Sequence, residues 1–349
     1  MLYKCARNAL FQLDPETSHD LSMASLKLMA KTPAGALIRS QVPDAPRKIW
    51  GIDFPNPVGL AAGLDKHADY LDGVAAMGFG FVEVGTVTPQ PQPGNPKPRL
   101  FRLPEHEAII NRFGFNSKGV DHLVEQVQRA NFNGVLGINI GKNKETPNES
   151  AVDDYLACMD KVYAHANYIT ANISSPNTPG LRALQKADSL IELIKPLKER
   201  QAKLADQYGR YVPIAVKIAP DLGDDEINMM AGVFSDTGID GLICSNTTLD
   251  RSAVEGHKHA EEVGGLSGAV LMQHSTEVLR KLRTAVGSEM PIIGVGGINS
   301  GDDAAEKIKA GADLVQIYSG FIYQGPSLIK DSVKAVSYTH LTLPTNREV

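Results

Sequence analysis

The sequence has few cysteines and no long apolar run, and each shortage excludes a class of protein. The three cysteines, Cys5, Cys158 and Cys244, lie far apart and show no Cys-x-x-Cys or Cys/His spacing. We therefore expect neither a disulfide framework nor a metal site, and a reducing compartment is favoured. No apolar stretch approaches the roughly 18 residues of a membrane span. The N-terminus also lacks the long apolar core and cleavage site of a signal peptide, so none is expected.

The sequence also lacks a large excess of charge of either sign. The 349 residues carry 35 basic and 40 acidic side chains, a net charge of −5. Without a basic excess, nucleic acid is not an expected partner. The 42% hydrophobic and 21% charged residues are ordinary for a globular protein. The length fits either two domains or a single α/β barrel.

Short apolar runs alternate with amphipathic stretches at helical period from about residue 57 onward. Near-continuous apolarity is typical of parallel strands, which are buried on both faces. Eight such strand-then-helix units predict an α/β fold of the (β/α)8 TIM-barrel type, with an open doubly wound sheet as the alternative. The predicted strands are Val58–Ala61, Phe81–Val84, Val135–Ile140, Tyr168–Ile173, Pro213–Ile218, Gly241–Ile243, Pro291–Val295 and Leu314–Tyr318.

Two segments do not follow the alternation. Residues 88–117 are rich in Pro, Gly and Asn, and they predict a small hairpin over the C-terminal face of the barrel. The N-terminus predicts a pair of helices, the second beginning at Asp14-Pro15 with Pro at its first position. The apolar residues 21, 23, 24, 26, 28 and 29 are expected to form one side of that helix. The pair either caps the barrel or docks on a membrane or lipid-like ligand.

Reactive groups of a closed barrel lie at the C-terminal ends of its strands. These positions carry two lysines, many side-chain amides and many glycines, and no His, Cys or carboxylate cluster. Amides suit a planar ligand with imide edges, and we interpret Lys66 and Lys217 as anion clamps. The pairs Gly296-Gly297 and Ser319-Gly320 favour a phosphate site. From the residues alone, Ser175 is either a reactive hydroxyl or part of a structural turn.

The motifs at these strand ends resemble those of one enzyme family. The resemblance runs from residue 1 to about 335, and it rests on Gly59–Lys66, Gly85–Asn95, Asn111–Asn116, Asn139–Lys142, Asn172–Gly180, Val216–Pro220, Asn246–Thr248, Gly264–Gly268, Ile293–Gly297 and Gln316–Gly320. These segments are similar to the dihydroorotate dehydrogenases. Ser175 and the N-terminal extension resemble class 2, which uses a serine base and passes electrons to a membrane quinone, rather than class 1, which uses cysteine.

The resemblance implies an FMN-dependent oxidation of dihydroorotate to orotate in pyrimidine biosynthesis. Ser175 would take the C5 proton while C6 delivers hydride to the flavin. Position 245 is Ser where Thr is common, and the hydroxyl is retained. The residues implied for FMN are Ala62, Gly63, Lys66, Thr86, Asn139, Asn172, Lys217, Ser245, Gly268, Gly297, Tyr318 and Ser319. Those implied for the substrate are Lys66, Asn111, Arg112, Phe113, Gly114, Phe115, Asn172, Asn177, Asn246 and Thr247.

The same resemblance divides the chain into three parts. Residues 1–40 would form the extension that docks quinone and membrane, 41–336 the FMN-binding barrel, and 337–349 a disordered tail outside the family's range. His19, Arg102 and Tyr318 would line the path of ubiquinone or menaquinone. The implied location is peripheral, on the cytoplasmic face of the inner cell membrane. Two alternatives stay open: a non-redox phosphate-binding aldolase or isomerase barrel, and a non-catalytic flavin-binding or lipid-docking protein.

Overall fold

Eight parallel strands close into a barrel in the computed structural model, which describes residues 2–30, 32, 35–38 and 41–342. The predicted (β/α)8 barrel is therefore confirmed, and the open sheet is excluded. Closure occurs where the last strand pairs with the first, Val315 opposite Val58. The barrel strands are β3 (Val58–Leu60), β4 (Phe81–Val87), β7 (Val135–Ile140), β8 (Tyr168–Asn172), β9 (Ile214–Ile218), β10 (Gly241–Cys244), β12 (Ile292–Val295) and β13 (Leu314–Ile317).

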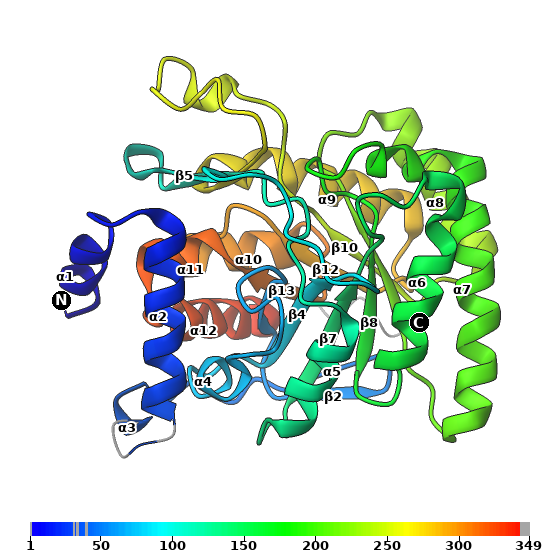
Figure 1. The fold of residues 1–349 in the computed structure, drawn as a ribbon, viewed down its shortest axis with the longest axis horizontal. Helices are drawn as coiled ribbons and strands as arrows, with labels where there is room; N and C mark the ends of the chain where they lie inside the picture. Colours follow the sequence, from blue (N-terminus) through cyan, green and yellow to red (C-terminus); the bar gives the residue numbers. More distant parts are fainter. Residues whose placement is uncertain (1, 31, 33–34, 39–40, 343–349) are drawn as a thin grey trace.

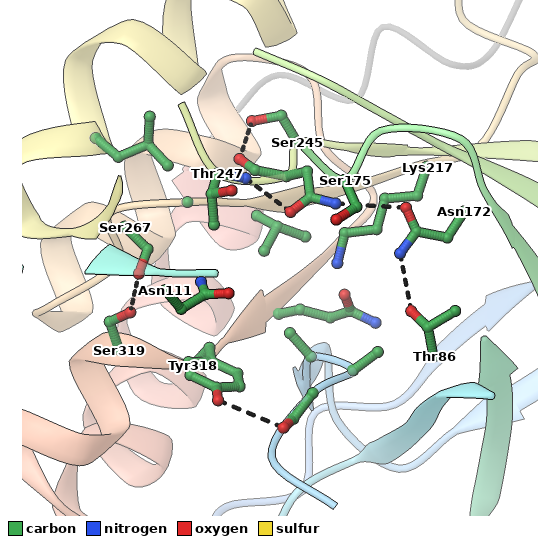
Figure 2. A pocket seen from close by; sticks show the side chains of 18 of the residues that line it. Thr86, Asn111, Asn172, Ser175, Lys217, Ser245, Thr247, Ser267, Tyr318 and Ser319 are labelled. Carbon is green, nitrogen blue, oxygen red and sulfur yellow. Dashed lines mark hydrogen bonds between the residues drawn. The ribbon is translucent and has the colours of Figure 1, made fainter. Parts of the chain in front are cut away.

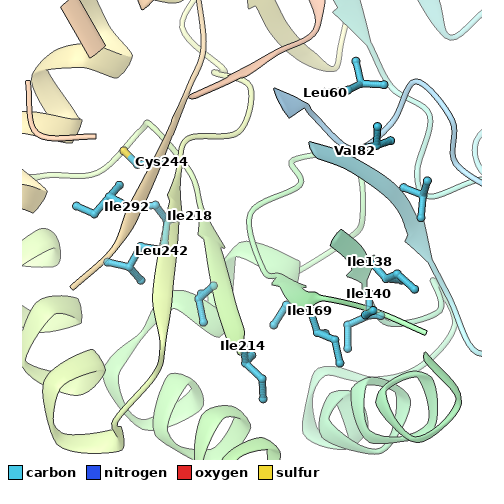
Figure 3. Packing of buried hydrophobic residues seen from close by; sticks show 14 of the residues in the cluster. Leu60, Val82, Ile138, Ile140, Ile169, Ile214, Ile218, Leu242, Cys244 and Ile292 are labelled. Carbon is cyan, nitrogen blue, oxygen red and sulfur yellow. The ribbon is translucent and has the colours of Figure 1, made fainter. Parts of the chain in front are cut away.

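Helices cover the outside of the barrel, and the larger hydrophobic core lies between them and the strands (Figure 3). Local signals fix their ends: Ser300 accepts a hydrogen bond from the backbone N–H of Asp303, which caps one helix start. Another helix ends at Gly238, which takes the left-handed conformation. These helices are α4 (Leu71–Ala75), α5 (Val120–Arg129), α6 (Ala151–Val162), α7 (Ala187–Tyr208), α8 (Asp224–Thr237), α9 (Met272–Val286), α10 (Gly301–Lys309), α11 (Ser319–Gln324) and α12 (Ser327–Thr342).

An aromatic cluster fills the N-terminal end of the barrel. The hairpin of β1 (Arg47–Ile49) and β2 (Ile52–Phe54) lies across this end, and the ring of fully buried Phe54 packs edge-on against Phe81 at 5.2 Å. The ring of Tyr168 also packs against Phe81. This hairpin, which the sequence analysis did not predict, closes the barrel opposite the strand ends that carry the polar residues.

The predicted hairpin of residues 88–117 is part of a larger sheet. Strands β5 (Leu100–Leu103) and β6 (Ala108–Asn111) pair as expected, and β11 (Gly265–Gly268) adds a third antiparallel strand. The ribbon shows β5 above the barrel end (Figure 1). This sheet therefore joins the loop that follows β4 to the loop that follows β10.

The N-terminal helices α1 (Leu2–Leu10) and α2 (Pro15–Ala30), followed by the short α3 (Gly35–Ile38), confirm the predicted extension. They lie at one side of the barrel (Figure 1), where α1 contacts α11 and α2 contacts α4 and β5. Asp14 caps α2, because its carboxylate accepts from the backbone N–H groups of Glu16 and Thr17. The single apolar side predicted for α2 is wrong. Met23 is buried, whereas Leu21 and Leu28 are 51% and 68% exposed, because they occupy another face of the helix.

The C-terminal helix is longer than the sequence indicated. Helix α12 continues to Thr342, so the expectation of a disordered tail from residue 337 is wrong for residues 337–342. The hydroxyls of Ser337 and Thr339 donate to carbonyls four residues back, and Thr339 is buried. Extending a formed helix costs little even with weak helix formers. Residues 343–349 lie outside the described part of the chain.

Candidate active site

A cavity of about 1020 Å³, including its solvent-filled mouth, opens at the C-terminal ends of the barrel strands. Enzyme sites of this fold occupy the same end. Nineteen of the predicted site residues line it: Ala62, Gly63, Lys66, Thr86, Asn111, Phe113, Gly114, Phe115, Asn172, Ser175, Asn177, Lys217, Ser245, Asn246, Thr247, Gly268, Gly297, Tyr318 and Ser319.

Ser175 lies in the cavity wall, in the loop that follows β8. Its hydroxyl oxygen accepts a hydrogen bond from the backbone N–H of Asn177 at 3.2 Å. The Asn177 amide in turn donates to the carbonyl oxygen of Asn111 at 3.0 Å, and so ties this loop to the small sheet. The loop thus has the turn geometry expected for its sequence while placing the hydroxyl in the cavity. The turn reading of Ser175 is therefore confirmed, whereas the reactivity of its hydroxyl stays a prediction.

Lys217, on β9, points into the same cavity (Figure 2). Burial lowers the pKa of its ammonium group, and the nearby carboxylate of Glu83 opposes that effect. Among the described residues no hydrogen-bond partner satisfies this ammonium group. A buried cation without a bonded partner is costly unless a ligand compensates it. An anionic or electron-rich ligand at this wall is therefore favoured.

Lys66 lies on the opposite side, in the loop after β3. Its ammonium nitrogen stands 3.5 Å from the centre of the Phe113 ring. Burial, together with the positive charge of Arg99, lowers the pKa of Lys66 to about 7. This lysine can therefore change charge near neutral pH, and an anionic ligand would hold it protonated.

The cavity also has a glycine turn without room for a side chain, and polar groups without a partner among the described residues. At Gly297 the backbone φ is +81°, and an added Cβ would lie 2.2 Å from Met272 Cα, so the loop there tolerates no side chain. The Oγ1 of Thr247 and the Oε1 of Gln316 are buried without a hydrogen-bond partner among the described residues. These groups, with Lys217, fit a large ligand rich in donors and acceptors.

Some lining residues were missed as site residues from the sequence. Ser267 shares a 2.8 Å hydrogen bond with Ser319 (Figure 2). Ser267 belongs to β11, which is not a barrel strand, so a search confined to barrel strand ends passes over it. Its position in the motif Gly264–Gly268 was the available signal. The other missed lining residues are Ala61, Leu271, Val295, Ile298, Gln316 and Ile317. Gly296 and Gly320, which the sequence analysis named for the phosphate site, also line the cavity.

Four predicted residues do not line the cavity. Asn139 lies behind its wall, where its Oδ1 accepts from the Thr86 hydroxyl at 2.6 Å. Arg112 turns outward to the Glu262 carboxylate at 2.6 Å. Arg102 donates to the carbonyls of Leu10, Phe11 and Leu13, where the first helix meets the second. His19 lies on α2, where burial and the charge of Lys66 lower its pKa to about 4, so it is neutral at pH 7.

Sequence and structure comparisons agree with this geometry. The family model described as dihydroorotate dehydrogenase matches residues 45–337. The chain belongs to the dihydroorotate dehydrogenase family. It is 59% identical over 334 residues to a dihydroorotate dehydrogenase (quinone) of Vibrio parahaemolyticus, covering 96% of this chain and 99% of that one. A second, of Azotobacter vinelandii, is 57% identical over 336 residues, 96% and 97% of the two chains.

A solved structure matches as well. The crystal structure of DHODH from Eimeria tenella in complex with ferulenol superposes with a TM-score of 0.85 at 40% identity, covering 94% of this chain and 91% of that one. The resemblance to the quinone-dependent class is thus confirmed, and the family is one of flavin-dependent oxidoreductases. These matches do not favour the aldolase or isomerase alternative.

Proposed function

We propose that this protein oxidises dihydroorotate to orotate and passes the electrons to a quinone, with Ser175 as the base. The observation that carries this proposal is the position of Ser175. Its hydroxyl shares the cavity with two lysines and a set of amides, the chemistry that fits a carboxylate and an imide edge. The family membership and the names of the relatives support the same reaction.

FMN is the cofactor that we propose for this cavity. The glycine turn at Gly297 and the paired hydroxyls of Ser267 and Ser319 would hold its phosphate, and Lys217 would face the electron-rich side of its ring. Gly63, Thr86, Asn172 and the other lining residues inferred from the motifs complete the set. When bound, FMN supplies the acceptor for the hydride that leaves C6 of the substrate.

The protein's own part is to orient the substrate and to move one proton. Lys66 would pair with the substrate carboxylate, and the amides of Asn111, Asn177 and Asn246 would meet its imide edge. The Oγ of Ser175 would receive the C5 proton while its own proton leaves. Thr178, three residues further on, has a buried hydroxyl without a partner among the described residues, and it can relay that proton to water by releasing its own.

We place the quinone site between α2 and the cavity, near His19, Arg102 and Tyr318. Tyr318 lines the cavity, and its hydroxyl donates to the Gly63 carbonyl at 3.4 Å. No helix within the described residues is long and apolar enough to cross a membrane. The exposed leucines of α2 support a peripheral contact with a membrane, whose cytoplasmic face we propose as the location.

The experiment is to measure the two half-reactions of Ser175→Ala separately. Anaerobic stopped-flow absorbance should show flavin reduction by dihydroorotate slowed by about 10²–10⁴-fold, the usual value of general base catalysis. FMN content and reoxidation by quinone should not change, because neither needs the C5 proton transfer. Ser332→Ala, which alters a buried serine of α12, is the matched control. Wild-type reduction rates in Ser175→Ala would exclude Ser175 as the base.

A further inference from the structure

A carboxylate lies inside the barrel, where no solvent reaches it. Glu83, on β4, is fully buried. Its Oε1 accepts from the Asn139 amide at 2.8 Å, and its Oε2 accepts from the Tyr168 hydroxyl at 2.9 Å and the Gln316 amide at 2.8 Å. All three donors are neutral. A buried carboxylate is costly and persists only where such donors satisfy it, yet no part of the proposed reaction uses Glu83.

Hydrogen bonds lead from this carboxylate to the cavity wall. The Asn139 Oδ1 accepts from the Thr86 hydroxyl at 2.6 Å, and the Thr86 oxygen accepts from the Asn172 amide at 2.9 Å. The second of these bonds is visible in Figure 2. The Asn172 Oδ1 accepts from the backbone N–H of Ser174 at 3.2 Å and from the amide of Asn246 at 3.4 Å.

The direction of this series is fixed at both ends. Both oxygens of the Glu83 carboxyl group accept hydrogen bonds, so Asn139 turns its NH2 toward Glu83 and its oxygen toward Thr86. The Thr86 hydroxyl must then donate to Asn139 and accept from Asn172. At the far end a backbone N–H can only donate, so Ser174 requires the Asn172 oxygen. Both ends demand one orientation of the Asn172 amide, and that amide lines the cavity.

We propose that Glu83 is a positioning residue, which acts through Asn139 and Thr86 to fix the orientation of the Asn172 amide toward the substrate. The proposal rests on the proposed function, because it assigns Asn172 and Asn246 to the substrate. With Glu83 in place, Asn172 and Asn246 present one pattern of donors and acceptors. Without Glu83, the Asn139 amide can exchange its NH2 and oxygen positions, and the Thr86 hydroxyl can then donate to Asn172 instead of accepting from it. The donors and acceptors that Asn172 presents would then not match the imide edge of orotate.

The test is a double-mutant cycle on orotate affinity, measured by the change in flavin absorbance of the FMN-loaded enzyme. Glu83→Leu and Thr86→Val each interrupt the series, and each should raise the orotate Kd about tenfold, ~1.4 kcal/mol. Because both act on one series, the double variant should also show about tenfold rather than hundredfold. Additive losses would overturn the proposal, because they would show independent effects.

Glu83→Gln is the rescue variant. A glutamine keeps an oxygen toward Asn139, and its NH2 can meet the Gln316 oxygen, which now has no partner among the described residues. The orotate Kd should stay within about threefold of wild type. Tyr168→Phe is the matched control, since it removes a donor from Glu83 on the side away from the series. A loss in Tyr168→Phe equal to that in Glu83→Leu would show that only packing matters.

Two further outcomes are distinguishable. If Glu83→Leu does not fold, Asn139→Asp replaces it. Aspartate beside Glu83 is repelled and should weaken orotate binding, whereas adding Glu83→Gln restores a donor and should recover the affinity; no recovery would overturn the proposal. If the wild-type enzyme fails to bind orotate at all, the proposed function itself is wrong. Unchanged orotate affinity in Glu83→Leu with normal wild-type binding contradicts only the role of Glu83.

Discussion

At the scale of single residues, the charge of Lys66 decides how the site responds to pH. Its pKa of about 7 lies far below that of a free lysine, because the group is buried beside Phe113 and near Arg99. Only the protonated form can pair with a carboxylate. The fraction in that form falls from about nine-tenths at pH 6 to about one-tenth at pH 8.

We therefore expect the orotate Kd of the FMN-loaded enzyme to rise roughly tenfold between pH 6 and pH 8. Equilibrium titration followed by flavin absorbance measures it. Lys66→Met should bind orotate weakly at every pH and lose this slope. A wild-type Kd that stays constant over the range would show that Lys66 does not pair with the ligand.

Lys66 also makes the stability of the folded protein depend on pH, but in the direction opposite to its effect on orotate affinity. Its folded-state pKa is depressed, so between about pH 7 and its unfolded value near 10.5 the unfolded chain binds more protons. The free energy of unfolding of the ligand-free protein therefore increases as pH rises through that window, which means that Lys66 destabilises the folded state less at high pH. Orotate affinity and this stability term should thus change in opposite directions with pH.

Most of the residues that line the cavity were predictable. In a closed barrel they lie at the C-terminal ends of the strands, and the hydrophobic pattern identified those strands. The side-chain directions were not predictable. Asn139 follows the same rule as Asn172, yet its amide faces Glu83 behind the wall. Arg112 stands beside Asn111 in the chain but bonds outward to Glu262, a partner from a remote loop. Such pairings depend on three-dimensional neighbours that no local pattern encodes.

At the scale of elements, α2 presents two different faces. Met23 packs into the core, and Glu16 forms an ion pair with Arg99 at 2.7 Å, so one face is held against the barrel and the small sheet. Leu21 and Leu28 are seven residues apart and therefore share the exposed face. Two exposed leucines on a helix beside the proposed quinone path suit a lipid surface.

The double variant Leu21→Ser, Leu28→Ser should bind vesicles of phosphatidylethanolamine and phosphatidylglycerol at least about tenfold more weakly, because burying a leucine is worth roughly 1.5–3 kcal/mol. Co-sedimentation measures this, and reduction of a water-soluble quinone should be unaffected. Leu249→Ser is the matched control, since Leu249 is 52% exposed in a loop of the barrel. Equal vesicle binding by wild type and the double variant would show that this face does not contact lipid.

The long elements were predictable and the short ones were not. Helices such as α8 carry an amphipathic period and a glycine stop, whereas β1 and β2 have three residues each, too few for a pattern. Strand β11 contains two glycines and one serine in four residues. Its pairing with β6 depends on a segment far away in the chain. Residues 337–342 of α12 continue a helix that is already formed, so they are helical although their composition does not favour a helix.

At the scale of the whole molecule, the aromatic cluster at the N-terminal end of the barrel stabilises the fold without contributing to the active site. Phe54 is fully buried against Phe81. Phe54→Ala should lower the free energy of unfolding by about 3–5 kcal/mol, the usual cost of removing a buried ring. Chemical denaturation of the FMN-free protein measures it. Phe132→Ala, at a half-buried ring, should cost less, and orotate affinity at 25 °C should not change in either variant.

The pairing of β13 with β3 also has a consequence for how the protein is made. Strand β3 leaves the ribosome early, while its partner β13 is among the last parts synthesised. Helices α1 and α2 emerge earlier still. They are held by Arg102 of β5 and by Arg99, the residue before that strand, and the sheet that contains β5 awaits β11. The nascent chain therefore exposes Leu21 and Leu28 before the barrel behind them is complete, and transiently exposed apolar surface of this kind is prone to aggregation. Pulse-labelled hydrogen exchange during refolding should show the amides of β3 becoming protected no earlier than those of β13.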